Sequence, residues 1–82
     1  MRINNAKEAK ELEASSRLKI IEETVIHALK IITDEAIQGR AKAEVLCPSC
    51  VKEKVVERLA QLDFRYFIRG DDGKYTTITI HW

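Results

Sequence analysis

Two cysteines in the stretch Cys47-Pro48-Ser49-Cys50 have a spacing that could form a redox-active thiol pair. The stretch lies between a predicted strand and a predicted helix. There, unpaired backbone N–H groups and the positive end of the helix dipole stabilise a thiolate. The alternative is a helix start that carries two small, semi-buried thiols, with Ser49 as its cap. We favour this alternative, because a lone motif needs its structural context.

The segment from Cys47 to Phe67 locally resembles the active-site turn and following helix of glutaredoxins. Proteins of the thioredoxin fold place a cis-proline beside the cysteine pair, whereas Pro48 is the only proline here. They also close with two strands and a helix, whereas this sequence ends at Trp82 in a predicted strand. A small thiol-disulfide oxidoreductase that uses Cys47 and Cys50 therefore stays the alternative function.

Cys47 and Cys50 together with His27 and His81 would supply the ligands of a Cys2His2 zinc site. In the predicted topology, however, Cys47 lies at one end of the sheet and His81 at the other. We therefore predict no metal site. We also predict no cofactor, because the sequence has neither a Gly-rich phosphate loop nor a nucleophile elbow. Asp71 and its neighbour Asp72 are predicted to be turn formers.

Helical periodicity covers residues 15–38, with Ser15 or Ser16 as the predicted cap and Gly39 as the stop. Residues 1–14 are predicted to be a flexible or helical arm, and residues 15–82 a single domain. After Gly39 the hydrophobic period changes to two over residues 41–45. A second helix is expected from Pro48 to residue 62, followed by strands at 64–69 and 74–82 that are joined by a turn.

This order of elements predicts the α+β class, in which a long N-terminal helix is followed by a βαββ unit. We expect a three-stranded mixed sheet with both helices on one face. A right-handed crossover would make the first two strands parallel, and the last strand would lie between them or outside. Ile78, Ile80 and Trp82 are predicted to point inward.

The long helix has two apolar stripes. The main one is formed by Leu18, Ile21, Val25, Ala28, Leu29, Ile32 and Ala36. The second, formed by Ile20, Thr24, His27 and Ile31, lies well over 90° away around the helix. We favour the second stripe as the interface of a homo-oligomer. The alternative is that the sheet and the N-terminal arm cover both stripes.

The sheet face opposite the helices carries the ligand-binding candidates Arg65, Arg69, Lys74, Tyr75 and His81. Guanidinium, aromatic and hydroxyl groups together suit phosphate binding and base stacking. The alternative is a solvated face that keeps the sheet soluble, and the sequence alone favours this alternative.

Composition excludes several classes of protein. Fourteen basic residues face thirteen acidic ones, for a net charge of +1, so no general nucleic-acid binding is expected. No apolar stretch approaches the roughly 20 residues of a membrane span, and the N-terminus lacks the core of a signal peptide. We therefore expect a protein of the cytoplasm without a membrane partner.

Motifs spread along the chain include an Ala-Lys-Glu-Ala opening at residues 6–9, a helix end at residues 35–39 and the ending Ile78-Thr79-Ile80-His81-Trp82. With these, the whole chain resembles a widespread group of small tailed-phage proteins of mostly undefined function. That group tends to end in Ile-Ser-Trp, so His81 is a departure, and the cysteine pair is not typical of it.

The resemblance implies a non-enzymatic accessory protein in the cytoplasm of an infected bacterial host, with a role in host takeover or anti-defence. Such a protein would act by binding a host protein or by sequestering a small anionic, nucleotide-like ligand, as a homo-oligomer.

Overall fold

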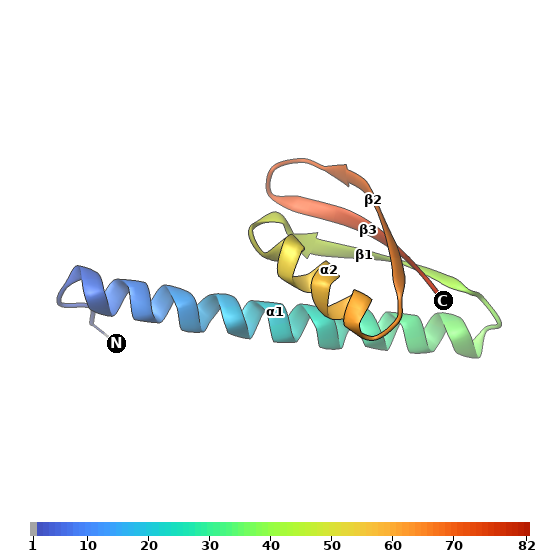
Figure 1. Ribbon diagram of the computed structural model, residues 1–82, viewed down its shortest axis with the longest axis horizontal. Helices are drawn as coiled ribbons and strands as arrows, with labels where there is room; N and C mark the ends of the chain where they lie inside the picture. The colour runs from blue at the N-terminus through green and yellow to red at the C-terminus, as the bar shows by residue number, and fades with distance from the viewer. Residues whose placement is uncertain (1) are drawn as a thin grey trace.

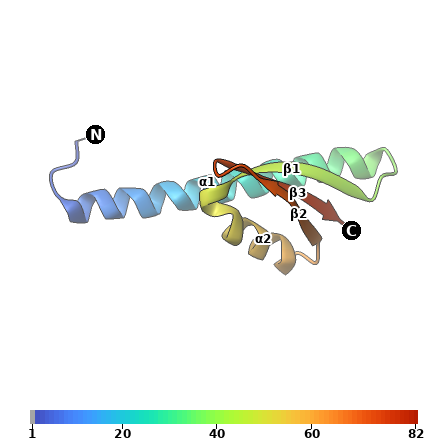
Figure 2. The same cartoon turned by 90° about the horizontal axis from the view of Figure 1, so that it is seen from above.

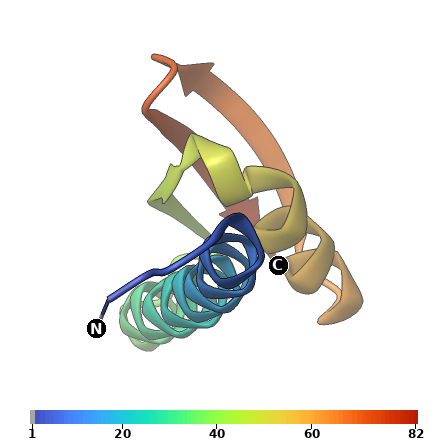
Figure 3. The ribbon, with the colours of Figure 1, turned by 90° about the vertical axis from the view of Figure 1, so that its left-hand side faces the viewer.

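A computed structural model of the protein describes residues 2–82. Its elements are α1 (Ala6–Ile37), β1 (Lys42–Pro48), the short 3-10 helix η1 (Ser49–Val51), α2 (Lys52–Gln61), β2 (Arg65–Asp71) and β3 (Tyr75–His81). The strands form one sheet in the order β1-β3-β2, and both helices lie against the same face of it (Figures 1 and 3). The predicted α+β class, with a long helix before a βαββ unit, is confirmed.

The sheet is antiparallel throughout, so the predicted mixed sheet is wrong. β3 pairs antiparallel with β1 on one side and with β2 on the other. β1 and β2 run in the same direction, as the crossover requires, but β3 separates them. With β3 in the centre, its backbone groups find partners on both sides, which an outer position would not provide.

α1 begins earlier than predicted. The Oδ1 atom of Asn5 accepts a hydrogen bond from the Glu8 N–H at 2.9 Å, and the Glu8 carboxylate accepts one from the Asn4 N–H at 2.9 Å. This reciprocal capping starts the helix at Ala6. The predicted cap at Ser15 or Ser16 is therefore wrong, since both residues lie inside α1. The first turns of α1 project beyond the sheet and α2 (Figure 2). Residue 1 of the predicted arm lies outside the described residues.

Both helices end in the same hydrogen-bonded turn. At the end of α1, Gly39 has φ +80°, and the Arg40 N–H donates to the Glu35 carbonyl at 3.0 Å, so the predicted stop is confirmed. At the end of α2, Asp63 takes the same position with φ +66°, and the Phe64 N–H donates to the Leu59 carbonyl at 3.1 Å.

The core lies between α1, α2 and the inner face of the sheet. α1 buries one stripe, whereas Leu18 and Ala36, predicted to belong to it, are exposed near the margins of the contact. The remaining core residues alternate along the strands or face inward from η1 and α2. The buried set on this side of the sheet is Ile21, Thr24, Val25, Ala28, Ile32, Ala43, Val45, Cys47, Val51, Val55, Val56, Leu59, Thr76, Ile78 and Ile80.

Trp82 lies at the margin of this core and is 41% exposed, so its predicted inward packing is corrected. β3 ends at His81, and the Trp82 N–H donates to the Ala41 carbonyl at 3.2 Å. The indole meets Phe64 edge-on, with ring centroids 6.4 Å apart. This contact covers part of the indole, and the residue keeps 41% of its surface exposed.

Candidate functional site

No helix or strand of residues 2–82 covers the face of the sheet opposite the helices (Figure 3), and we call it the open face. Strand register places Lys42, His81 and Arg65 side by side across it, one from each strand. We call these three residues the basic row. The next row consists of Glu44, Thr79 and Phe67. Three side chains that can each carry positive charge are therefore aligned at one end of the open face.

Two shallow depressions meet at this end of the sheet, and both include Arg40 and Lys42. One has a volume of about 360 Å³ and is also lined by Ala41 and His81. The other has a volume of about 240 Å³, and its remaining lining residues are Glu35, Ala43, Glu44, Arg69 and Thr79. Basic and acidic side chains therefore border a hollow that is large enough for a small polar ligand.

The cations at this end differ in how they are paired. Arg40 contacts the Glu35 carboxylate at 2.9 Å, and Arg69 Nε lies 4.0 Å from a Glu44 carboxylate oxygen. Among residues 2–82, Lys42 and Arg65 form no ion pair. These two charges are free to bind an anion, because no carboxylate would have to be displaced.

Thr79 adds a polar group without a partner. Its side chain is 8% exposed, and within residues 2–82 its Oγ1 is the one buried side-chain oxygen or nitrogen that has no hydrogen-bond partner. Arg69 of β2 and Glu44 of β1 approach each other across β3, which carries Thr79 between them. Buried hydroxyl groups are nearly always hydrogen-bonded, so Thr79 is an unusual polar group at the centre of the open face.

The structure brings together only part of the predicted ligand site. Arg65 and His81 are direct neighbours. Tyr75 begins β3, about 20 Å along the strand from His81, and Lys74 Nζ lies 5.8 Å from the Tyr75 ring centroid. Arg69 lies between these groups. Arg40, Lys42, Phe67 and Thr79 were not among the predicted site residues, because the strand order decides which side chains of different strands meet.

The thiol pair has the wrong exposure for a redox centre. Cys47 is buried on the inner face of β1, where burial, with a smaller contribution from Cys50, raises the pKa of its thiol to about 11. Its Sγ–H donates to the Pro48 carbonyl at 3.4 Å. Cys50 is exposed in η1, and both thiols are free. A nucleophilic cysteine needs an accessible thiolate, which Cys47 does not offer.

Titration with a thiol reagent should therefore give one rapid reaction, at Cys50, in the native protein. Cys47 should react only when urea unfolds the chain, because the buried thiol neither ionises nor contacts the reagent near neutral pH. Cys50→Ser should abolish the native reaction, whereas Cys47→Ser should leave it unchanged. Rapid modification of both thiols in the native protein would contradict this assignment and support the oxidoreductase hypothesis.

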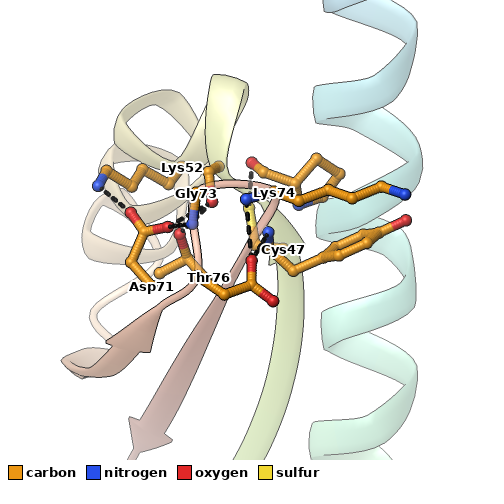
Figure 4. A network of polar contacts seen from close by, with 10 residues as sticks. Cys47, Lys52, Asp71, Gly73, Lys74 and Thr76 are labelled. Carbon is orange, nitrogen blue, oxygen red and sulfur yellow. Dashed lines mark hydrogen bonds and ion pairs between the residues drawn. The ribbon is translucent and has the colours of Figure 1, made fainter.

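A polar cluster closes the β2–β3 hairpin onto η1 (Figure 4). The Asp71 carboxylate accepts hydrogen bonds from Lys52 Nζ at 2.7 Å, the Gly73 N–H at 2.8 Å and Ser49 Oγ at 2.8 Å. These contacts, with Lys52 first, hold the pKa of Asp71 well below its usual range. Asp72 accepts from the N–H groups of Lys74 and Tyr75. The predicted role of both aspartates as turn formers is confirmed.

The predicted oligomer stripe on α1 is divided by the fold. Thr24 is buried in the chain's own core, Ile20 and Ile31 pack partly against that core, and His27 is exposed.

In register, Cys47 and His81 lie at opposite ends of the sheet, as predicted. Residues 2–82 contain no group of three or more His, Cys, Asp or Glu side chains that could hold a metal ion.

No protein-family model matches the chain. Comparisons with curated proteins and with solved structures also gave no match. Among the helices of residues 2–82, none combines the length and apolar character that crossing a membrane would need.

Proposed function

We propose that this is a non-enzymatic binding protein that holds a small anionic, nucleotide-like ligand at the basic row. The observation that carries the proposal is the alignment of Lys42, His81 and Arg65 across three strands, next to the unpartnered hydroxyl of Thr79. Lys42 and Arg65 would bind a phosphate group through charge-assisted hydrogen bonds.

The neighbouring groups suit the rest of such a ligand. Phe67 lies one row from Arg65 and is largely exposed, so its ring is available for stacking by a base. The carboxylates of Glu35 and Glu44 border the depression that Thr79 also lines, and they can accept hydrogen bonds from ligand hydroxyl or amino groups. A phosphorylated nucleoside combines these features.

The likeness to small tailed-phage proteins supports a role for this binding in the cytoplasm of an infected bacterium. By sequestering a nucleotide signal, the protein would act in host takeover or block a host defence system. This action needs no catalytic group. The proposal includes a homo-oligomer as the active form.

The experiment is calorimetric titration with inorganic phosphate, mononucleotides and cyclic nucleotides, preceded by a thermal-shift screen. The double variant Lys42→Ala/Arg65→Ala should lose at least about a hundredfold in affinity, since each charge-assisted hydrogen bond contributes about 1.5–3 kcal/mol. The control Lys19→Ala/Lys30→Ala removes two positive charges from exposed sites on α1 and should bind as the wild type does. If no nucleotide binds, or if both double variants lose affinity equally, the basic row is not the site.

A further inference from the structure

The edge of the sheet at β2 carries three consecutive exposed apolar side chains. All seven residues of β2 are exposed, and Tyr66, Phe67 and Ile68 have exposed fractions of 43%, 63% and 42%. One side of β2 pairs with β3, and no strand of residues 2–82 lies beside the other (Figures 1 and 3). A long apolar edge strand offers its free backbone groups to another strand.

The apolar residues of β2 point to both faces of the sheet. Tyr66 and Ile68 pair with Ile80 and Ile78, so they lie on the face that the helices cover, whereas Phe67 pairs with Thr79 on the open face. On the open face Arg65 and Arg69 flank Phe67, so Phe67 is the one apolar side chain that β2 places there. The exposed apolar segment in the middle of this edge still favours pairing with another strand.

We propose that β2 pairs antiparallel with β2 of a second copy of this chain, which joins the two sheets into one of six strands. The inference rests on the proposed homo-oligomer and names its surface, the edge of β2 rather than α1. Pairing of β2 with itself gives a closed two-fold dimer, whereas pairing of β2 with β1 of the next copy would continue without closing.

Two-fold symmetry restricts the register, because each side chain must meet a residue on its own face. Centring the pair on Phe67 would place Arg65 opposite the partner copy's Arg69, and like charges in that position destabilise a sheet. Centring the pair on Ile68 places Ile68 of one chain opposite Ile68 of the other. Arg69 then lies opposite Phe67, so a guanidinium group can lie over an aromatic ring on each side of the axis.

The ends of β2 are also self-complementary in this register. The bulge between Ile68 and Gly70 shifts the pairing beyond it by one residue. Tyr66 therefore meets the segment Gly70-Asp71 of the second copy, where an aromatic ring can cover the glycine. Arg65 lies near Asp71 and Asp72 of the second copy, and opposite charges across strands stabilise the pairing. In the dimer these carboxylates would compete with a bound anion for Arg65, whereas Lys42 on β1 is away from this edge.

Light scattering tests the dimer directly. The wild type should have a mass of about 19 kDa, twice the 9.4 kDa of one chain. Ile68→Lys places a lysine against its own copy at the centre of the interface. It should raise the dissociation constant at least about thirtyfold, as loss of a central interface residue does. Ile26→Lys, the same change at an exposed position of α1, is the matched control and should leave the dimer intact.

A cross-linking experiment remains decisive even if Ile68→Lys fails to fold. In a Cys50→Ser background, Ile68→Cys should be joined into dimers by a short bismaleimide reagent, whereas Ile26→Cys should not. A wild type that stays monomeric at high micromolar concentration would overturn the proposal. So would a dimer that survives Ile68→Lys but dissociates in Ile26→Lys or Ile31→Asp. Lys42→Ala, on β1 and away from this edge, tests the basic row separately: it should weaken nucleotide binding and leave the dimer intact, so failure of one proposal does not imply failure of the other.

Discussion

Leu59→Ala is expected to lower the free energy of unfolding by about 2–5 kcal/mol. Leu59 is fully buried in α2, where this helix meets the core. The lost methyl groups leave a cavity that the surrounding side chains fill only in part. A domain of this size has roughly 4–12 kcal/mol of total stability, so the variant should lose a large share of it. Urea denaturation followed by circular dichroism measures the change.

The matched control is Leu62→Ala. Leu62 follows α2 and is half exposed, so the same truncation should change the free energy of unfolding by no more than about 1 kcal/mol. If both variants lost the same stability, the packing of α2 against the core would differ from the structure described here.

The second large effect is expected from Ala28→Leu. Ala28 has no exposed surface and lies in the stripe of α1 that contacts the core. The larger side chain would force α1 away from the sheet, which typically costs about 1–3 kcal/mol and sometimes more. The melting temperature should fall accordingly, while the helical signal in circular dichroism persists in the native state.

Ala14→Leu is the control for this variant, because it makes the same substitution in the projecting half of α1, where Ala14 is exposed. We expect a change of at most about 0.5 kcal/mol. A large loss at Ala14 would show that the first half of α1 is packed in solution, for instance against a second copy.

The helix ends show which local signals a sequence reveals. Gly39 was predictable because glycine adopts positive φ without steric cost, and it follows a clear helical period. Asp63 takes the same conformation, although its side chain disfavours positive φ. The helix-ending hydrogen bonds offset this conformational cost. The start of α1 was missed because the apolar period begins near Leu18, whereas capping at Asn5 adds further turns that bury little.

The candidate site required information beyond the sequence. The order of elements allowed two places for the last strand, and only the central place aligns Lys42, His81 and Arg65. The burial of Thr79 depends on side chains from the two neighbouring strands, which no periodicity reveals. Arg65 and His81 were identified beforehand because they lie on the polar side of strands with a clear alternation.

The projecting helix has a consequence for hydrodynamic measurements. The chain measures 51 × 23 × 19 Å, and its radius of gyration is 14.9 Å, whereas a compact protein of 82 residues has about 12 Å. Such a rod-like particle diffuses more slowly than a sphere of equal mass and elutes early from a gel-filtration column. An elution volume calibrated with spherical standards would therefore report an inflated mass, and a single chain could be mistaken for a pair.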